Sequence, residues 1–178
     1  INKFGYDING DDSMKKIMPI FIFLTLIFIT GCSLGNTPTS KVDELMGKYQ
    51  RLDTEIKDEI KEVVASNNID ESYQDRYIKA LEKQYCNLTY EIKNEAIDGN
   101  TAIVTTQIEV TDYKKALNTI DRDDLTDEEY YEESLTAIEE AKEKVTYTID
   151  FTLTKDDAGN WQLDELSEVD KKKIQGTY

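Results

Sequence analysis

Residues 145–154 constrain the fold of this chain more than any other segment, because their side chains alternate strictly between apolar and polar. The apolar set is Val145, Tyr147, Ile149, Phe151 and Leu153, and the polar set is Thr146, Thr148, Asp150, Thr152 and Thr154. A strand with this alternation has one face against a core and the other in water. The chain is therefore expected to contain an antiparallel sheet that is covered on one face only.

Two hairpins extend this sheet to four strands. Asp98-Gly99-Asn100 is a hairpin signal between two alternating runs, and Asp156-Asp157-Ala158-Gly159-Asn160 forms a second turn. The apolar positions of the first hairpin are Leu88, Tyr90, Ile92, Ala102, Val104, Ile108 and Val110. Trp161 and Leu163 continue the apolar face on the last strand. The four strands are predicted to form a meander.

Helical patterns fill the rest of the chain. Ser40 is a candidate N-cap for one helix with an apolar stripe over residues 42–64, and Asp70 is a candidate N-cap for a second helix. A short helix is predicted over residues 113–120. Thr126 and Glu129 form a capping box for a helix reaching about Lys144. Ser167 is expected to cap a closing turn. The order α-α-β-β-α-α-β-β predicts an α+β fold with helices on one face of a curved four-stranded antiparallel sheet.

The N-terminal part has the pattern of a targeting segment. Met14-Lys15-Lys16 is a positive start, and residues 17–29 are uncharged and mostly apolar. A membrane-spanning helix needs roughly 20 apolar residues, so this run is short for an anchor and fits the central region of a signal peptide. Residues 14–31 are therefore predicted to be the signal peptide. Residues 1–13 are polar, and we interpret them as an over-extended start before Met14.

Ile29-Thr30-Gly31-Cys32 resembles the lipobox of bacterial lipoproteins: an aliphatic residue, a small or polar one, glycine, and then cysteine. The resemblance implies that signal peptidase recognises these four residues and cuts before Cys32. It also implies that a diacylglyceryl group (the kind of anchor that palmitate labels) joins the Cys32 thiol to the cell membrane on its extracytoplasmic face. Residues 32–40 then form a flexible tether and residues 41–178 the folded domain. An ordinary signal anchor with an incidental cysteine is the alternative.

The body resembles the nuclear-transport-factor-2-like or cystatin-like domains found in small lipoproteins of low-GC Gram-positive bacteria. The resemblance rests on the order of helices and hairpins, on Tyr85-Cys86-Asn87-Leu88-Thr89-Tyr90, and on Gly159-Asn160-Trp161-Gln162-Leu163. It implies a fold in which helices and a curved sheet often enclose a cone-shaped cavity. Residues 113–144 are a long insertion for this family.

Composition excludes several classes of function. The 178 residues carry a formal net charge of -16, which opposes binding to nucleic-acid phosphates. Histidine is absent, so a serine–histidine triad and an imidazole zinc site are both excluded. With Cys32 acylated, Cys86 is expected to be a reduced, packed residue at the start of a strand. No cofactor is expected.

The acidic run over residues 121–133 could hold calcium, but Leu125 and Thr126 break the EF-hand ligand pattern. Acids are also favourable at the start of a helix, so no metal site is predicted here. Asp156, Asp157 and Asn160 are explained by their turn. The strand acids Glu91, Glu109 and Asp150 fall on polar faces, where burial does not raise a carboxyl pKa. This placement argues against an acid–base enzyme.

Tyrosine and tryptophan are the candidate pocket residues, because each combines a large apolar ring with one polar atom. The candidates are Tyr73, Tyr77, Tyr90, Tyr147 and Trp161, and Tyr85, Tyr113, Tyr130 and Tyr131 belong to the wider set. Ordinary core packing of these rings is the alternative.

The sequence thus predicts a membrane-anchored extracytoplasmic lipoprotein with a non-catalytic binding or interaction domain for an unknown protein or small ligand. The alternative is a small-ligand-binding pocket protein or a ketosteroid-isomerase-like enzyme.

Overall fold

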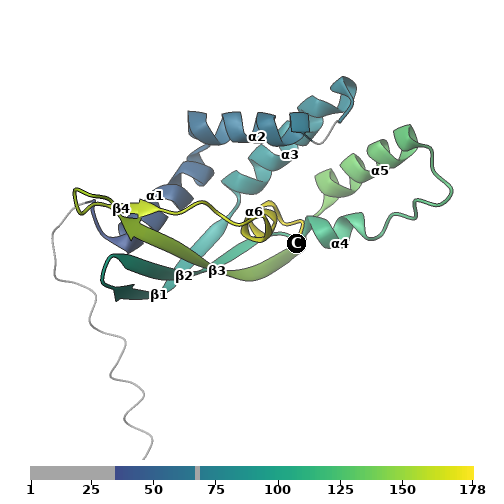
Figure 1. Ribbon diagram of the computed structural model, residues 1–178. Helices are drawn as coiled ribbons and strands as arrows, with labels where there is room; N and C mark the ends of the chain where they lie inside the picture. Colours follow the sequence, from purple (N-terminus) through teal and green to yellow (C-terminus); the bar gives the residue numbers. More distant parts are fainter. Residues whose placement is uncertain (1–34, 67–68) are drawn as a thin grey trace, which may run out of the picture. The chain divides into compact units, whose positions relative to one another are not determined.

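The computed structural model describes residues 35–66 and 69–178. The signal peptide, Cys32 and residues 1–13 lie outside these residues. The described part is an α+β fold in the order α1 (Pro38–Arg51), α2 (Thr54–Ser66), α3 (Glu71–Cys86), β1 (Thr89–Asp98), β2 (Thr101–Thr111), α4 (Tyr113–Leu117), α5 (Asp127–Glu140), β3 (Lys144–Lys155), β4 (Trp161–Leu163) and α6 (Glu168–Gln175) (Figure 1). The predicted fold class is confirmed.

The four strands form one antiparallel sheet in the order β1-β2-β3-β4, as the meander predicts. Gly99 and Asn100 form a two-residue turn between the paired residues Asp98 and Thr101. Gly99 has φ +58°, a conformation that suits glycine at this kind of turn. A bulge between Ile92 and Asn94 shifts the register of β1, and such an extra residue bends its strand.

One face of the sheet is buried and the other is open. Val104 pairs with Phe151 and Thr106 pairs with Ile149, and all four side chains are almost completely buried. Thr148, Asp150 and Thr152 point away from the core and are exposed. The buried apolar strand residues belong to one core cluster, which also contains Val42, Met46 and Tyr49 of α1. The alternation over residues 145–154 therefore decides which side of the sheet the helices cover.

The single helix predicted over residues 42–64 is wrong, because the structure divides it into α1 and α2. Leu52 has φ 51° and ends α1 in the left-handed conformation, where its N–H bonds back to the last turn. The break lets α1 lie on the sheet while α2 packs on α3. Leu52 itself packs against the main core, so tertiary burial stabilises a backbone conformation that leucine disfavours by roughly 1–2 kcal/mol.

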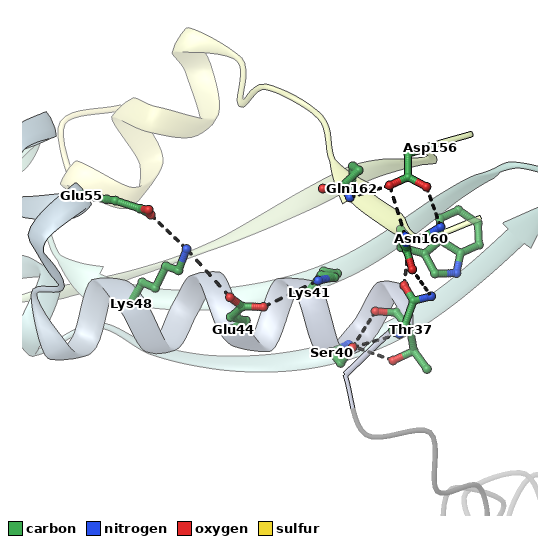
Figure 2. A network of polar contacts seen from close by, with 11 residues as sticks. Thr37, Ser40, Lys41, Glu44, Lys48, Glu55, Asp156, Asn160 and Gln162 are labelled. Carbon is green, nitrogen blue, oxygen red and sulfur yellow. Dashed lines mark hydrogen bonds and ion pairs between the residues drawn. The ribbon is translucent and has the colours of Figure 1, made fainter. Parts of the chain in front are cut away.

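The first helix begins earlier than predicted. Thr37, and not Ser40, is the N-cap of α1, and Thr37 and Ser40 bond to each other's backbone in a capping box, with Pro38 in the first turn (Figure 2). Proline suits this place because its missing N–H has no partner in the first turn of a helix. Residues 38–40, which were expected to belong to the tether, therefore form the start of α1.

The other predicted caps are confirmed. Asp70 caps α3, the Thr126–Glu129 capping box opens α5, and Ser167 caps α6, which is a helix of two turns. The helix predicted to reach Lys144 ends at Glu140, and β3 begins at Lys144. None of the helices described over residues 35–66 and 69–178 is long and apolar enough to cross a membrane.

The insertion between β2 and β3 forms α4 and α5, which pack on each other and beside α3 (Figure 1). A second, smaller apolar cluster lies there, made by Ala80, Tyr113 and Ile138 with Tyr77, Leu117 and Ala141 around them. The insertion is thus a separate layer on the helices, beyond the edge of the main core.

Candidate functional site

A pocket of about 290 Å³ lies between α3 and α5, and we call it the α3–α5 pocket. The end of α2, α4 and the C-terminal residues complete its wall. Its lining consists of Val63, Val64, Ile69, Tyr77, Ala80, Leu81, Tyr113, Leu117, Tyr130, Tyr131, Ser134, Ile138, Gln175 and Thr177. None of these fourteen side chains carries a charge at neutral pH.

Helical periodicity places the lining residues of α3 and of α5 each on one face of their helix. On α3, Tyr77, Ala80 and Leu81 follow the three- and four-residue spacing that puts side chains on one helix face. On α5, Tyr130, Ser134 and Ile138 recur every four residues. Two chain segments that are far apart in sequence therefore present matching apolar faces, and the space left between them is the pocket.

Arg76 joins α3 to α5 beside the pocket. Its guanidinium group donates to the Glu132 carboxylate at 2.7 Å and to the Glu139 carboxylate at 2.9 Å. These bonds raise the pKa of Arg76 and lower the pKa of Glu139. A planar guanidinium that engages two carboxylates one helical turn or more apart sets the spacing of the two helices.

Tyr113 is a buried tyrosine of the pocket wall. Its side chain is almost fully buried, and its hydroxyl donates to the backbone oxygen of Ala80 at 3.1 Å. Burial raises the pKa of Tyr113 to about 12 and also raises the pKa of Tyr77. Both hydroxyls therefore stay protonated at neutral pH, and the pocket remains uncharged.

Ser134 contributes a buried, unpartnered hydroxyl to the wall of the α3–α5 pocket. The residue is 2% exposed, and its Oγ has no hydrogen-bond partner among the described residues. Buried polar groups in folded proteins are nearly always paired, so a free hydroxyl on a pocket wall marks a place for an incoming polar atom. Sequence reasoning missed Ser134, although its position four residues after Tyr130 and before Ile138 was a usable signal.

The five predicted pocket residues do not gather at one site. Tyr77 lines the α3–α5 pocket, and Tyr73 stacks on Tyr131 of the pocket wall with ring centroids 5.8 Å apart. Tyr90 donates to Asp43 of α1 instead, and Tyr147 donates to the backbone oxygen of Tyr178 at 3.0 Å. Trp161 is part of the main core, with Lys155 over its ring. Tyr113, Tyr130 and Tyr131, which belonged to the wider set, line the pocket instead.

A second, more open groove of about 690 Å³ runs between α1, α2 and the segment from β4 to α6. Glu59 lies in its wall, and burial raises the pKa of this carboxyl above its usual value, although Lys171 opposes the shift. The sequence-based prediction covered only the strand acids and missed this helix residue. The predicted strand acids Glu91, Glu109 and Asp150 are exposed, as expected. The groove is lined by many other charged residues, which distinguishes it from the apolar surroundings of an acid–base carboxyl.

The sequence predicts that Cys86 is packed at the start of a strand, and this prediction is wrong. Cys86 is the last residue of α3, and its free thiol is exposed. Each helical residue turns the side chain by about 100°, so the buried side of α3 ends with Gln84 and Tyr85, and Cys86 faces water. Over residues 35–66 and 69–178 no three cysteine or acidic side chains are placed to hold a metal.

The folded body holds the chain from Asn36 onward. Asn36 Oδ1 accepts the Trp161 backbone N–H at 2.9 Å, and its Nδ2 donates to Asn160 Oδ1 at 3.2 Å. Asp156 orders the same turn through Asn160 and Gln162 (Figure 2). Farther along α1, Lys48 forms ion pairs with Glu44 and Glu55 (Figure 2). The start of α1 is thus attached to the β3–β4 turn.

No family model and no curated protein matches this chain. Among solved structures, the chain is similar to a Bacillus subtilis protein, ycdA, whose crystal structure is described as that of a "putative lipoprotein". The two are 14% identical with a TM-score of 0.41, and the match covers 75% of this chain and 46% of the other. The chain thus spans less than half the length of that protein, and a similarity at this level carries no statement about function.

Proposed function

We propose that this protein is a lipid-anchored extracytoplasmic protein whose folded body is a non-catalytic binding module. The observation that carries the proposal is Ile29-Thr30-Gly31-Cys32 placed directly after an uncharged, apolar run that follows Lys15-Lys16. Charge, length of the apolar run and the four-residue box all agree with a lipoprotein signal. Two acyl chains on Cys32 give stable anchoring, whereas one chain holds only marginally.

The attachment of Asn36 to the folded body sets how far the body reaches from the anchor. The chain from Cys32 to Asn36 spans at most about 14 Å when extended. This is shorter than the tether of residues 32–40 expected from the sequence. The net charge of -16 repels the body from anionic lipids. The anchored body is therefore held close to the membrane by its link and pushed away from the surface by its charge.

A binding role suits the folded body better than catalysis. The α3–α5 pocket is lined mostly by tyrosine and aliphatic side chains, and no carboxylate or thiol is among the described lining residues. The isomerase-like alternative needs a carboxylate inside an apolar pocket, and Glu59 lies in the open, charge-lined groove instead. The α3–α5 pocket favours a small ligand as the partner of the binding module.

Labelling with radioactive palmitate tests the anchor. Wild-type protein and the Cys86→Ala variant are expected to incorporate the label equally, and Cys32→Ala is expected to incorporate none. Cys86 is the matched control because its thiol is exposed in the folded body. Equal labelling of Cys32→Ala, or a chain that stays uncut in the cytosol, contradicts the anchor. Digestion of intact cells by an external protease tests the extracytoplasmic face.

A further inference from the structure

We propose that the α3–α5 pocket is a binding site for a small, uncharged aromatic molecule that presents one hydrogen-bonding group to Ser134 Oγ. The inference rests on the proposed binding role of the folded body and adds the chemical class of its ligand. It is independent of the lipid anchor, because no residue of the pocket belongs to the signal segment.

The volume of the pocket sets the size of the ligand. Ligand pockets usually enclose about 300–1,000 Å³, and an engineered apolar cavity of about 150 Å³ holds one benzene ring. The α3–α5 pocket, at about 290 Å³, lies just below the first range and near twice the second value. A molecule of one or two fused rings fits this space.

The lining sets the chemistry of the ligand. Tyr77, Tyr130 and Tyr131 line the pocket, and aromatic rings favour offset or edge-on contact with another aromatic ring. Arg122 covers one face of the Tyr130 ring, 4.4 Å from its centroid, so Tyr130 has one face left for a ligand. Tyr131 is already held by stacking on Tyr73, so its ring is pre-oriented. None of the described lining residues is charged, so none can neutralise an ionised ligand, and burying an unpaired charge is strongly unfavourable. The favoured ligand is therefore uncharged.

Ser134 makes the site selective for a ligand with a polar atom. Its hydroxyl is a donor and an acceptor without a partner in the described residues, on the wall of a mainly apolar pocket. A ligand that supplies the missing partner regains one hydrogen bond, whereas a purely hydrocarbon ligand leaves the hydroxyl unpaired. Thr106 Oγ1 is the other unpartnered buried hydroxyl of the described residues, and Thr106 does not line this pocket.

The test is a titration of the full chain with 2-naphthol and with naphthalene, which differ by one hydroxyl group. Binding is followed by the amide chemical shifts of Tyr77, Tyr131 and Ser134, so that partitioning of the probes elsewhere does not interfere. We expect both probes to saturate these shifts, with 2-naphthol binding about fivefold tighter because it completes one hydrogen bond.

Three variants locate the effect. Ser134→Ala is expected to bind both probes equally, because the unpaired hydroxyl is gone. Thr106→Val, which removes the other unpaired hydroxyl, is expected to keep the fivefold preference. Leu117→Trp is expected to abolish binding of both probes by filling the pocket from α4. Ser134→Ala should fold at least as stably as wild type, since an unsatisfied polar group is removed.

Two results overturn the proposal. One is the absence of saturable shifts at the pocket residues with either probe, and the other is an unchanged preference for 2-naphthol in Ser134→Ala. Either result leaves palmitate labelling at Cys32 unaffected, so failure of the ligand site is distinguishable from failure of the anchor. The Cys32→Ala variant is expected to bind both probes as wild type does.

Discussion

The side-chain amide of Gln84 is paired with the backbone of Thr111 in both directions. Gln84 Nε2 donates to the Thr111 oxygen at 2.8 Å, and Gln84 Oε1 accepts the Thr111 N–H at 3.0 Å. The amide also donates to the Gln175 oxygen at 3.1 Å. Gln84 is 1% exposed. One buried side chain thus connects α3 to the end of β2 and to the end of α6, next to the α3–α5 pocket.

Replacing Gln84 with leucine should destabilise the fold by about 2–4 kcal/mol, because the buried Thr111 N–H and oxygen lose their partner together. The measurement is the free energy of unfolding from urea denaturation. Gln162→Leu is the matched control, since Gln162 is exposed and its amide donates to Asp156 of the β3–β4 turn. A cost for Gln84→Leu no larger than that for the control contradicts the assigned role.

Gly176 lies against the same pair and should tolerate no side chain. It has φ +73°, and an added Cβ would lie 2.1 Å from the Thr111 oxygen and 2.3 Å from Gln84 Nε2. Gly159 has a similar φ of +81° but meets nothing within 4 Å. Left-handed strain alone should cost Gly159→Ala about 1 kcal/mol, whereas Gly176→Ala should cost about 3 kcal/mol or more because overpacking adds to the strain.

Thermal unfolding of the two alanine variants gives this comparison directly. Similar unfolding midpoints for Gly159→Ala and Gly176→Ala would mean that the close approach of Gly176 to Thr111 and Gln84 does not affect the stability of the variant. A Gly176→Ala chain that fails to fold while Gly159→Ala folds agrees with the predicted order.

Glu59→Gln should stabilise the protein at neutral pH, and the gain should disappear in acid. Burial raises the pKa of this carboxyl in the folded state, so the folded protein favours the protonated form. That favourable contribution is complete below the pKa of the unfolded chain, and it is lost as the pH rises through the folded pKa. At pH 7 the ionised carboxylate is therefore a cost that the neutral glutamine removes.

Unfolding midpoints of Glu59→Gln and wild type, measured from pH 3 to pH 7, test this sign. Glu133→Gln removes one negative charge from an exposed position of α5, outside the groove that holds Glu59, so it corrects for the change in net charge. A stabilisation by Glu59→Gln that grows as the pH falls contradicts the prediction.

The helices and strands follow from local signals in the sequence. The alternation over residues 145–154, the turn at Asp98-Gly99-Asn100 and the capping box of Thr126 and Glu129 each depend on residues close together in the chain. Their physical causes are side-chain period, turn conformation and pairing of the first helical N–H groups. These causes act in any surrounding fold, and for this reason the α+β class and the four-stranded meander were predictable.

Only the tertiary structure decides the break at Leu52 and the membership of the pocket. Leu52 has the left-handed conformation, and its side chain packs on the main core. No local sequence pattern predicts a helix break at this leucine. Arg76 and Glu132 are 56 residues apart, and Gln84 and Thr111 are 27 apart. The spacing of tyrosines predicts which face of a helix a ring lies on. Which rings contact one another depends on how helices that are distant in sequence pack together. The five aromatic candidates therefore lie in four places, while the wall of the α3–α5 pocket consists of residues brought together by the packing of α3 against α5.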